Sequence, residues 1–243
     1  MLRTHHIFMI GESPLVREYS ALCLNRKQAV TARLNRGEPA QLPKGVKRAA
    51  APAKSVTVAL ELTNIAIDVK RKNLILLDRS LGSGIPIISS SLTVTVAEQS
   101  SWIEHPGRLV GIGALPSLLD GSLIEFAPSE ATTDASITRA KDFAATLGKE
   151  AAVVQDSIGL VMPRILCTLA NEAYFAMTED VAAGDDIDTA MKLGTNYPAG
   201  PVERAGKIGL RSVCAVLRAL HDHFGEERYR IAPSLHRAAF RNP

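Results

Sequence analysis

The sequence has few of the features that mark secreted, membrane or disulfide-bonded proteins. Its 243 residues include three cysteines, Cys23, Cys167 and Cys214, which are widely spaced and form no CxxC pair. This usage excludes a disulfide framework and predicts reduced, buried thiols in a cytoplasmic protein. No segment approaches the roughly 18 apolar residues of a membrane span, and the apolar run near the start is too short for a signal peptide.

Nucleic acids and metals are excluded as partners on similar grounds. The chain has 28 Lys and Arg against 25 Asp and Glu, a net charge of +3, and no alternation of aromatic and basic residues that would suit base stacking. His5 and His6 are adjacent, but no third ligand lies near them in the sequence. We therefore expect no metal site.

The first two thirds of the chain alternate predicted strands with predicted helices. The apolar stretch HIFMIG (residues 6–11) predicts a strand, residues 14–28 a helix and residues 29–35 a second strand. This strand–turn–helix–strand unit is typical of the start of a doubly wound nucleotide-binding fold. Further strands are predicted over residues 56–62, 86–91, 108–115, 122–129 and 149–157, and further helices over residues 66–81 and 133–148.

The segment Arg36–Ser55 interrupts this alternation. It is rich in proline and basic residues and has no periodicity, which predicts an exposed loop. The alternative is a basic loop that grips phosphate or coenzyme A.

From Ser157 onward the pattern predicts helices only, over residues 159–181, 185–193, 202–208 and 212–224. Alternating strands and helices followed by helices alone imply two domains. We predict an α/β domain over residues 1–156 and an all-α helical domain over residues 157–243.

The stretch DDIDTAMKLGTNYPAGP (residues 185–201) predicts a dense corner between two helices. Asp185 or Asp186 is expected to cap the first helix and Gly194 to end it, and the turn NYPAGP is expected to start the next helix at Pro201. The corner contains no base or nucleophile, so its role is structural.

This stretch resembles the C-terminal helical domain of the 3-hydroxyacyl-CoA dehydrogenase family. NEA (residues 171–173), DIDTAMKLG and YPAGP follow one another in the order and spacing of the family. The ending HFGEERYRIAPSLHRAAF (residues 223–240) is similar to two-part bacterial members that handle 3-hydroxyadipyl-CoA, and DVKRKNLILLD and SSSLTVT extend the similarity toward the N-terminus. The resemblance to 3-hydroxybutyryl-CoA and 3-hydroxyadipyl-CoA dehydrogenases implies a reduced Rossmann domain, NAD as cofactor and an acyl-CoA substrate of fatty acid metabolism.

The NAD-binding turn that the resemblance implies is altered here. The turn is IGESPLV (residues 10–16), in which Gly11 remains but Ser13 and Val16 stand where the family has its other two glycines. Pro14 removes an N–H donor, and Glu12 brings a negative charge to the place where phosphates would lie. Gly11 is thus a weak candidate for cofactor binding.

The catalytic positions that the resemblance implies are also only partly kept. The family's histidine base falls on Gly113, and its substrate-contacting asparagine falls on Pro163, inside the first turns of a predicted helix. The glutamate that would orient the base remains as Glu125, and the family's serine remains as Ser90. His105 cannot be assumed to replace the base. The helical hairpin that the family inserts after the second strand is missing as well.

These departures lead us to expect a catalytically degenerate pseudoenzyme that acts through its helical domain. Its partner would be a second copy of the chain, forming a homodimer, or a separately encoded active dehydrogenase paralogue. One alternative is an active NAD-dependent 3-hydroxyacyl-CoA dehydrogenase with a displaced site. Another is an acyl-CoA-binding protein without redox chemistry.

Overall fold

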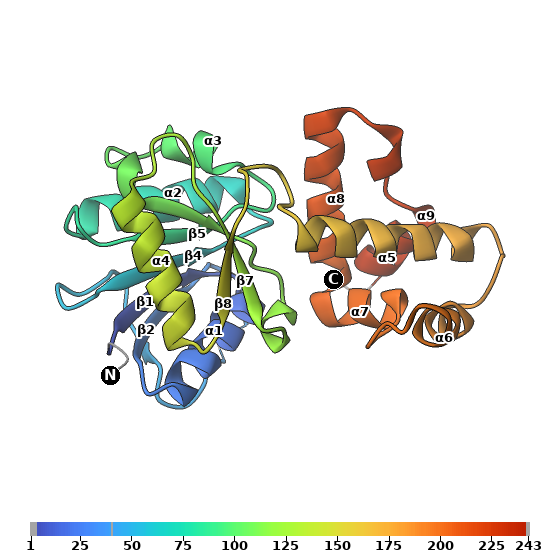
Figure 1. Cartoon of the computed structure of the whole chain (residues 1–243), viewed down its shortest axis with the longest axis horizontal. Coiled ribbons are helices and arrows are strands. Elements are labelled where there is room, and N and C mark those ends of the chain that lie inside the picture. Colours follow the sequence, from blue (N-terminus) through green and yellow to red (C-terminus); the bar gives the residue numbers. More distant parts are fainter. Residues whose placement is uncertain (1–3, 40, 242–243) are drawn as a thin grey trace.

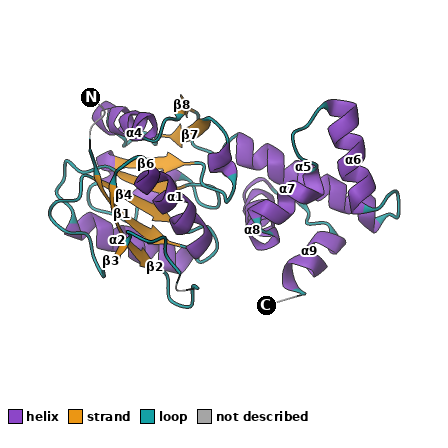
Figure 2. Ribbon diagram, turned by 90° about the horizontal axis from the view of Figure 1, so that it is seen from below, coloured by secondary structure: helices purple, strands orange, loops and turns teal. Residues whose placement is uncertain are grey.

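A computed structural model describes residues 4–39 and 41–241. It contains one eight-stranded sheet with helices on both faces, and a group of helices at one end of the sheet (Figures 1 and 2). The sheet order is β3-β2-β1-β4-β5-β6-β7-β8, and every pairing is parallel except β6 with β7. The strands are β1 (His6–Gly11), β2 (Ala29–Leu34), β3 (Lys47–Arg48), β4 (Val58–Leu62), β5 (Ile87–Ser90), β6 (Leu109–Ile112), β7 (Leu123–Ala127) and β8 (Glu150–Val153).

Four helices cover the two faces of the sheet. Apolar side chains of α1 (Ser13–Asn25) and α4 (Asp134–Thr146) share one buried cluster with the strands. Side chains of α2 (Ile67–Ser80) and α3 (Val96–Ser100) belong to a second cluster. Helices on both faces explain why almost every residue of the central strands β1, β4, β5 and β6 is buried.

The second cluster continues beyond the sheet into the helical region. Ile158 and Leu160 are buried in the connection that leads to this region, and they join its core to the core under α2. The helices here are α5 (Met162–Thr178), α6 (Gly184–Thr195), α7 (Pro201–Ile208), α8 (Leu210–Phe224) and α9 (Pro233–Phe240). The predicted fold class, a Rossmann-like α/β domain followed by an all-helical region, is confirmed. The predicted division after residue 156 falls in the connection between β8 and α5.

Several local predictions are corrected. The segment Arg36–Ser55, of which residue 40 lies outside the described residues, is not wholly a loop, because β3 pairs with β2 inside it. The helices α3 and α9 were not predicted. The helix expected from Gly159 begins at Met162. All three cysteines are free and buried. Among the described residues, no helix combines the length and apolarity needed to cross a membrane, and no group of potential metal ligands occurs.

Candidate functional site

Gly11 ends β1 at the turn where the Rossmann fold would hold a cofactor. A Cβ atom at this residue would lie 2.5 Å from the backbone carbonyl of Leu62, on the neighbouring strand β4. This distance is far below any van der Waals contact, so only glycine fits. The close approach of two strands therefore explains Gly11 without any cofactor.

The N-terminus of α1 is already occupied by a carboxylate of the chain itself. The backbone N–H of Ser13 donates to Oε2 of Glu38 at 2.8 Å, and the Ser13 hydroxyl donates to the carbonyl of Pro39 at 3.3 Å. The N-terminus of a helix is where a Rossmann fold binds pyrophosphate, because free N–H groups and the helix dipole favour an anion there. In this chain the segment after β2 folds back and supplies that anion.

Glu12 fills the same turn from the other side. Its side chain is buried, and its Oε1 accepts the backbone N–H groups of Asn64 at 2.9 Å and Ile65 at 2.7 Å. Burial raises the pKa of the Glu12 carboxyl, the two N–H groups oppose this, and the charges of Glu61 and Glu38 raise it further. With two carboxylates in place of glycine backbone, the turn does not fit the pyrophosphate of NAD.

Gly113 and Glu125, the positions of the family's base and its orienting acid, lie side by side. A Cβ atom at Gly113 would be 3.5 Å from Oε2 of Glu125 and 3.5 Å from a methyl group of the buried Leu160. The Glu125 carboxylate accepts the backbone N–H groups of Val161 at 3.1 Å and Met162 at 2.8 Å. Glu125 therefore caps α5, and Leu160 occupies space beside the base position.

Ser90 lies at the end of β5, next to this group. Its hydroxyl donates to Oδ1 of Asn64 at 2.6 Å, and the amide of Asn64 donates to the carbonyl of Ala114 at 2.9 Å. All of these groups are buried. Asn64 was missed from the sequence, because it belongs to no motif and only the fold brings it to Ser90. The structure thus gathers Ser90, Gly113 and Glu125 at one edge of the sheet.

Pro163 is the second residue of α5 and is buried. The first turn of a helix needs no i→i−4 N–H donor, so proline is favourable there. Pro163 lies in the first turn of the helix because α5 begins at Met162, three residues later than the predicted start at Gly159. Pro163 therefore causes no strain in α5, and its presence is no evidence that a functional side chain was lost at this position.

His105 lies at the opposite end of β6 from Gly113, the position of the family's base. It precedes β6, whereas Gly113 follows it. Its side chain is 53% exposed and lies 3.3 Å from the carboxylate of Asp78. A four-residue strand separates His105 from Glu125 and Ser90, so His105 does not replace the missing base.

The corner around Gly200 owes its shape to Asp188. The two carboxylate oxygens of Asp188 accept the backbone N–H groups of Val202 and Glu203, each at 2.8 Å. A Cβ atom at Gly200 would lie 2.2 Å from the Asp188 side chain, so glycine is required for this cap. The predicted start of α7 at Pro201 is confirmed.

The ends of α6 differ from the prediction. No side chain caps its start, and Asp185 and Asp186 lie within the first turn. The helix ends at Thr195 with Asn196 in the left-handed conformation, not at Gly194.

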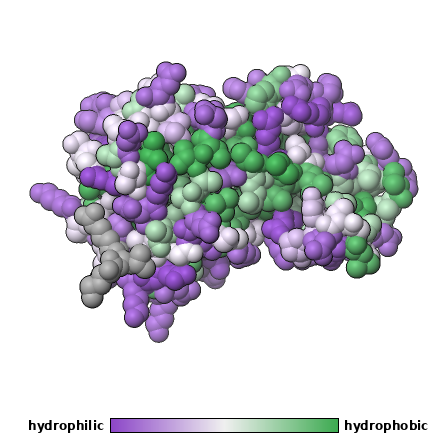
Figure 3. All heavy atoms as spheres, in the orientation of Figure 1, coloured by the Kyte–Doolittle hydropathy of each residue, from purple (hydrophilic) through white to green (hydrophobic). Residues whose placement is uncertain are grey.

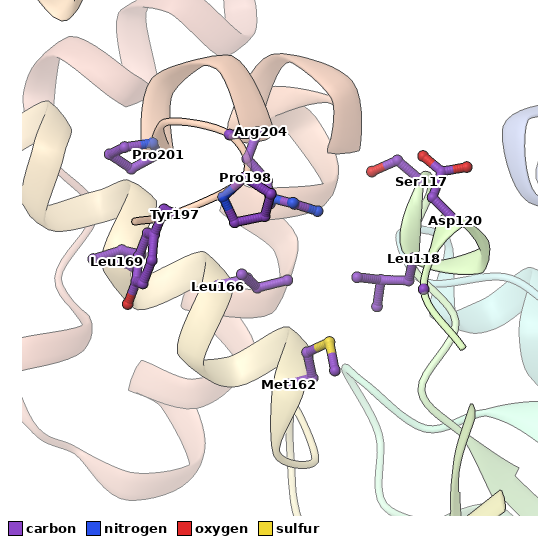
Figure 4. Close-up of a pocket in the computed structure, with 12 residues that line it drawn as sticks. Ser117, Leu118, Asp120, Met162, Leu166, Leu169, Tyr197, Pro198, Pro201 and Arg204 are labelled. Carbon is purple, nitrogen blue, oxygen red and sulfur yellow. The ribbon is translucent and has the colours of Figure 1, made fainter. Parts of the chain in front are cut away.

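A cavity of about 460 Å³ lies between the helical region and the loop that follows β6 (Figure 4). The helical side is mainly apolar, and the loop side carries Ser117 and Asp120. Arg204 on α7 points across the cavity toward this loop. The lining residues are Ser117, Leu118, Asp120, Gly121, Met162, Leu166, Leu169, Tyr197, Pro198, Ala199, Pro201 and Arg204.

Comparisons with known proteins agree with the resemblance. A family model described as "3-hydroxyacyl-CoA dehydrogenase, C-terminal domain" matches residues 159–241. A 3-hydroxybutyryl-CoA dehydrogenase of Bradyrhizobium diazoefficiens is 33% identical over 168 residues, which cover 69% of this chain and 57% of that protein. A probable 3-hydroxybutyryl-CoA dehydrogenase of Bacillus subtilis is 31% identical over 159 residues, which cover 65% and 55%. The chain therefore spans little more than half the length of these relatives.

The fold of the whole chain is also that of a solved relative. The crystal structure of (S)-3-hydroxybutyryl-CoA dehydrogenase from Ralstonia eutropha superposes with a TM-score of 0.79 at 22% identity. The superposition covers 96% of this chain and 93% of that one.

Proposed function

Since this chain belongs to the 3-hydroxyacyl-CoA dehydrogenase family, we propose that it uses the family fold without hydride transfer and acts by pairing through its helical region. The observation that supports this most directly is the hydrogen bond from Ser13 N–H to the Glu38 carboxylate. A pyrophosphate would have to displace Glu38 and then lie beside the buried Glu12. The negative charge of the Glu12 carboxylate would repel the negatively charged pyrophosphate and so oppose its binding.

The absence of a base beside Glu125 supports the same proposal. Gly113 offers no proton acceptor, and the Glu125 carboxylate accepts the N–H groups of Val161 and Met162 at the start of α5. A general base must reach the substrate hydroxyl directly or through one water. His223 on α8 lines a separate cavity with Asn64 and Thr93, but among the described residues no hydrogen bond joins a histidine to Glu125, Ser90 or Asn64.

Calorimetric titration with NADH tests the proposal. We expect no binding by the native protein up to millimolar NADH, and micromolar binding would overturn the proposal. The double variant Glu12→Gln/Glu38→Gln removes both negative charges while it keeps amide oxygens as acceptors, so it is expected to bind NADH more tightly than the native protein does. Glu130→Gln, at an exposed acid beyond β7, is the matched control and is expected to leave NADH binding unchanged.

The proposed pairing face lies at the start of α5. Val161, Met162 and Ile165 are 48%, 39% and 57% exposed, and a band of apolar atoms runs over α5 toward the sheet (Figure 3). Contiguous exposed apolar surface of this kind marks interaction sites. The partner is a second copy of the chain or an active dehydrogenase paralogue.

Sedimentation velocity tests the pairing. Ile165→Lys is expected to shift a dimer toward monomer, whereas Val181→Lys, an equally polar change at a side chain that is 71% exposed beyond the end of α5, is not. If the native protein is a monomer, the same variants are tested by pull-down of a co-expressed dehydrogenase paralogue. If Ile165→Lys changes neither assembly, the proposed face is wrong.

An active dehydrogenase is the second candidate, and the names of the relatives favour it. This candidate requires a proton acceptor other than residue 113. Turnover of 3-hydroxybutyryl-CoA with NAD by the native protein, lost in Ser90→Ala, would support it over the first.

A further inference from the structure

Basic residues of the chain are concentrated in one segment. Residues 33–55 contain six of the 28 Lys and Arg residues but only one of the 25 Asp and Glu residues. This single acid, Glu38, already accepts the backbone N–H of Ser13. All six basic side chains are exposed. We call this surface the basic edge, and its members are Arg33, Arg36, Lys44, Lys47, Arg48 and Lys54.

The basic edge surrounds the outermost strand of the sheet. Lys47 and Arg48 form β3, which pairs only with β2 in the part of the chain that the structure describes. Nη1 of Arg33, on β2, donates to the carbonyl of Ala50 at 3.1 Å. Arg33 and Arg48 also line one hollow of about 370 Å³. Basic side chains on an edge strand oppose unspecific pairing with other strands, but they attract a surface of opposite charge.

Acidic side chains gather at the turn between α5 and α6. Glu179 and Asp180 follow the end of α5, and the first turn of α6 carries Asp185 and Asp186. All four are exposed, and none forms an ion pair within residues 4–39 and 41–241. No Lys or Arg occurs between residues 164 and 192. We call these four acids the acidic turn.

The basic edge and the acidic turn lie in opposite halves of the molecule (Figures 1 and 2). β3 is one outer strand of the sheet, whereas the chain enters the helical region after β8, the other outer strand. The two surfaces therefore cannot meet within one chain. Opposite charges on separate molecules attract over about 30 Å at 10 mM salt and about 10 Å at 0.1 M salt. Such complementarity steers association and sets the orientation of the partners.

We propose that the basic edge binds the acidic turn of a second copy of the chain. Charge complementarity identifies this occupant, because the chain itself carries four exposed acids without an ion pair. Residues 33–55 contain no aromatic side chain on which a base could stack, so a nucleic acid fits the basic edge less well. The two surfaces differ, so the contact is heterologous and successive copies join head to tail. The contact uses neither the cofactor turn nor Ile165, and it is therefore independent of the function proposed above.

Sedimentation velocity of the full chain at low salt (about 10 mM) and high salt (about 300 mM) tests the contact, because only high salt screens the exposed charges. At low salt the sedimentation coefficient of the native protein is expected to rise with protein concentration, and at high salt this rise is expected to vanish. Pairing through Ile165 is apolar and is not screened, so species that persist at high salt belong to that face. The same behaviour at low and high salt would overturn the proposal without any variant.

Two charge-reversal variants identify the surfaces. Lys44→Glu/Lys47→Glu changes the basic edge, and Glu179→Lys/Asp186→Lys changes the acidic turn. Each variant alone is expected to need about tenfold more protein for half-maximal association at low salt, since several weak exposed ion pairs are lost. An equimolar mixture is expected to form a heterodimer, because the intact acidic turn of the first variant meets the intact basic edge of the second. A variant that had merely unfolded could not recover in this mixture, so a mixture that does not associate would overturn the proposal.

Lys72→Glu/Lys141→Glu is the matched control, since it makes the same change of charge at exposed sites on α2 and α4. It is expected to associate as the native chain does, and a loss as large as that of Lys44→Glu/Lys47→Glu would contradict a defined contact. Cosedimentation with phosphatidylglycerol vesicles examines another occupant. If the native chain stays monomeric at low salt but binds these vesicles through Lys44 and Lys47, the basic edge is a lipid-binding surface and the proposal is wrong.

Discussion

Oε1 of Glu125 accepts the backbone N–H of Met162 at 2.8 Å, across 37 residues of sequence. A side chain of the sheet thus caps the first helix of the helical region. The family resemblance assigns this acid to a histidine at position 113, where this chain has glycine. In the structure, Glu125 instead binds the backbone of the connection between the sheet and the helical region.

Glu125→Ala is expected to lower the free energy of unfolding by about 1–2 kcal/mol. The change leaves the N–H groups of Val161 and Met162 without their acceptor, and loss of a helix cap costs about this much. Urea denaturation followed by circular dichroism measures it, with Glu130→Ala as the exposed control. Equal stability of the two variants would show that the cap contributes nothing.

The sequence predicted the elements that depend on local pattern. The apolar strand predicted over residues 6–11 matches β1, in which residues 7–11 are all buried. Pro201 was correctly placed at the start of α7, because proline fits the first turn of a helix.

Contacts between distant segments could not be predicted in the same way. The carboxylates of Glu38, Glu125 and Asp188 each accept N–H groups at the start of a helix to which they do not belong. Nothing in the sequence around these acids distinguishes them from exposed acids. The prediction that Asp185 or Asp186 caps α6 is wrong, because no side chain caps the start of this helix and both acids lie in its first turn.

Asp188→Ala is expected to destabilise the protein by about 1–2 kcal/mol. The substitution removes both acceptors at the start of α7. Asp185→Ala, in the first turn of the same helix as Asp188, loses only a favourable interaction with the helix dipole, worth about 0.3–1 kcal/mol. Chemical denaturation of both variants checks the order. A larger loss of stability in Asp185→Ala than in Asp188→Ala would support the prediction that Asp185 caps α6.

Substitution by alanine is expected to change stability little at Gly113 and to reduce it clearly at Gly111. A Cβ at Gly113 meets its nearest atoms at 3.5 Å, an ordinary contact, so Gly113→Ala is expected to change stability by less than about 1 kcal/mol. A Cβ at Gly111 would lie 2.4 Å from a methyl group of Val96, so Gly111→Ala is expected to cost about 1–3 kcal/mol. Thermal unfolding of the pair tests this. Strong destabilisation by Gly113→Ala would mean that glycine is required at the base position for packing.

The three cysteines are expected to be inert in the folded protein. Burial raises the pKa of Cys23 to about 12 and that of Cys214 to about 11, and it also raises the pKa of Cys167. The thiolate is the reactive form, so Ellman's reagent at pH 8 is expected to react with none of them until urea is added. Rapid reaction of one equivalent in the native state would contradict this burial.

Glu12→Gln isolates the charge at the cofactor turn from its hydrogen bonds. Both N–H groups, from Asn64 and Ile65, donate to Oε1 of Glu12. The amide oxygen of glutamine can accept the same two bonds, so the variant keeps the geometry and loses only the negative charge. We expect it to fold as the native chain does.

The pH dependence of this variant follows from the raised pKa of Glu12, which burial causes. An acid whose pKa is raised on folding binds its proton more tightly in the folded state. The stability that the proton provides is therefore fully present below the unfolded pKa of about 4.3, and it is lost as the pH rises through the folded pKa. Glutamine does not titrate, so Glu12→Gln is expected to be more stable than the native protein at pH 8 and to lose this advantage toward pH 4. Urea denaturation of both proteins between pH 4 and pH 8 measures the difference. A difference that stays constant with pH would show that the Glu12 carboxyl titrates alike in the folded and unfolded chain, and the argument that its charge opposes a pyrophosphate from within a buried turn would then lose its basis.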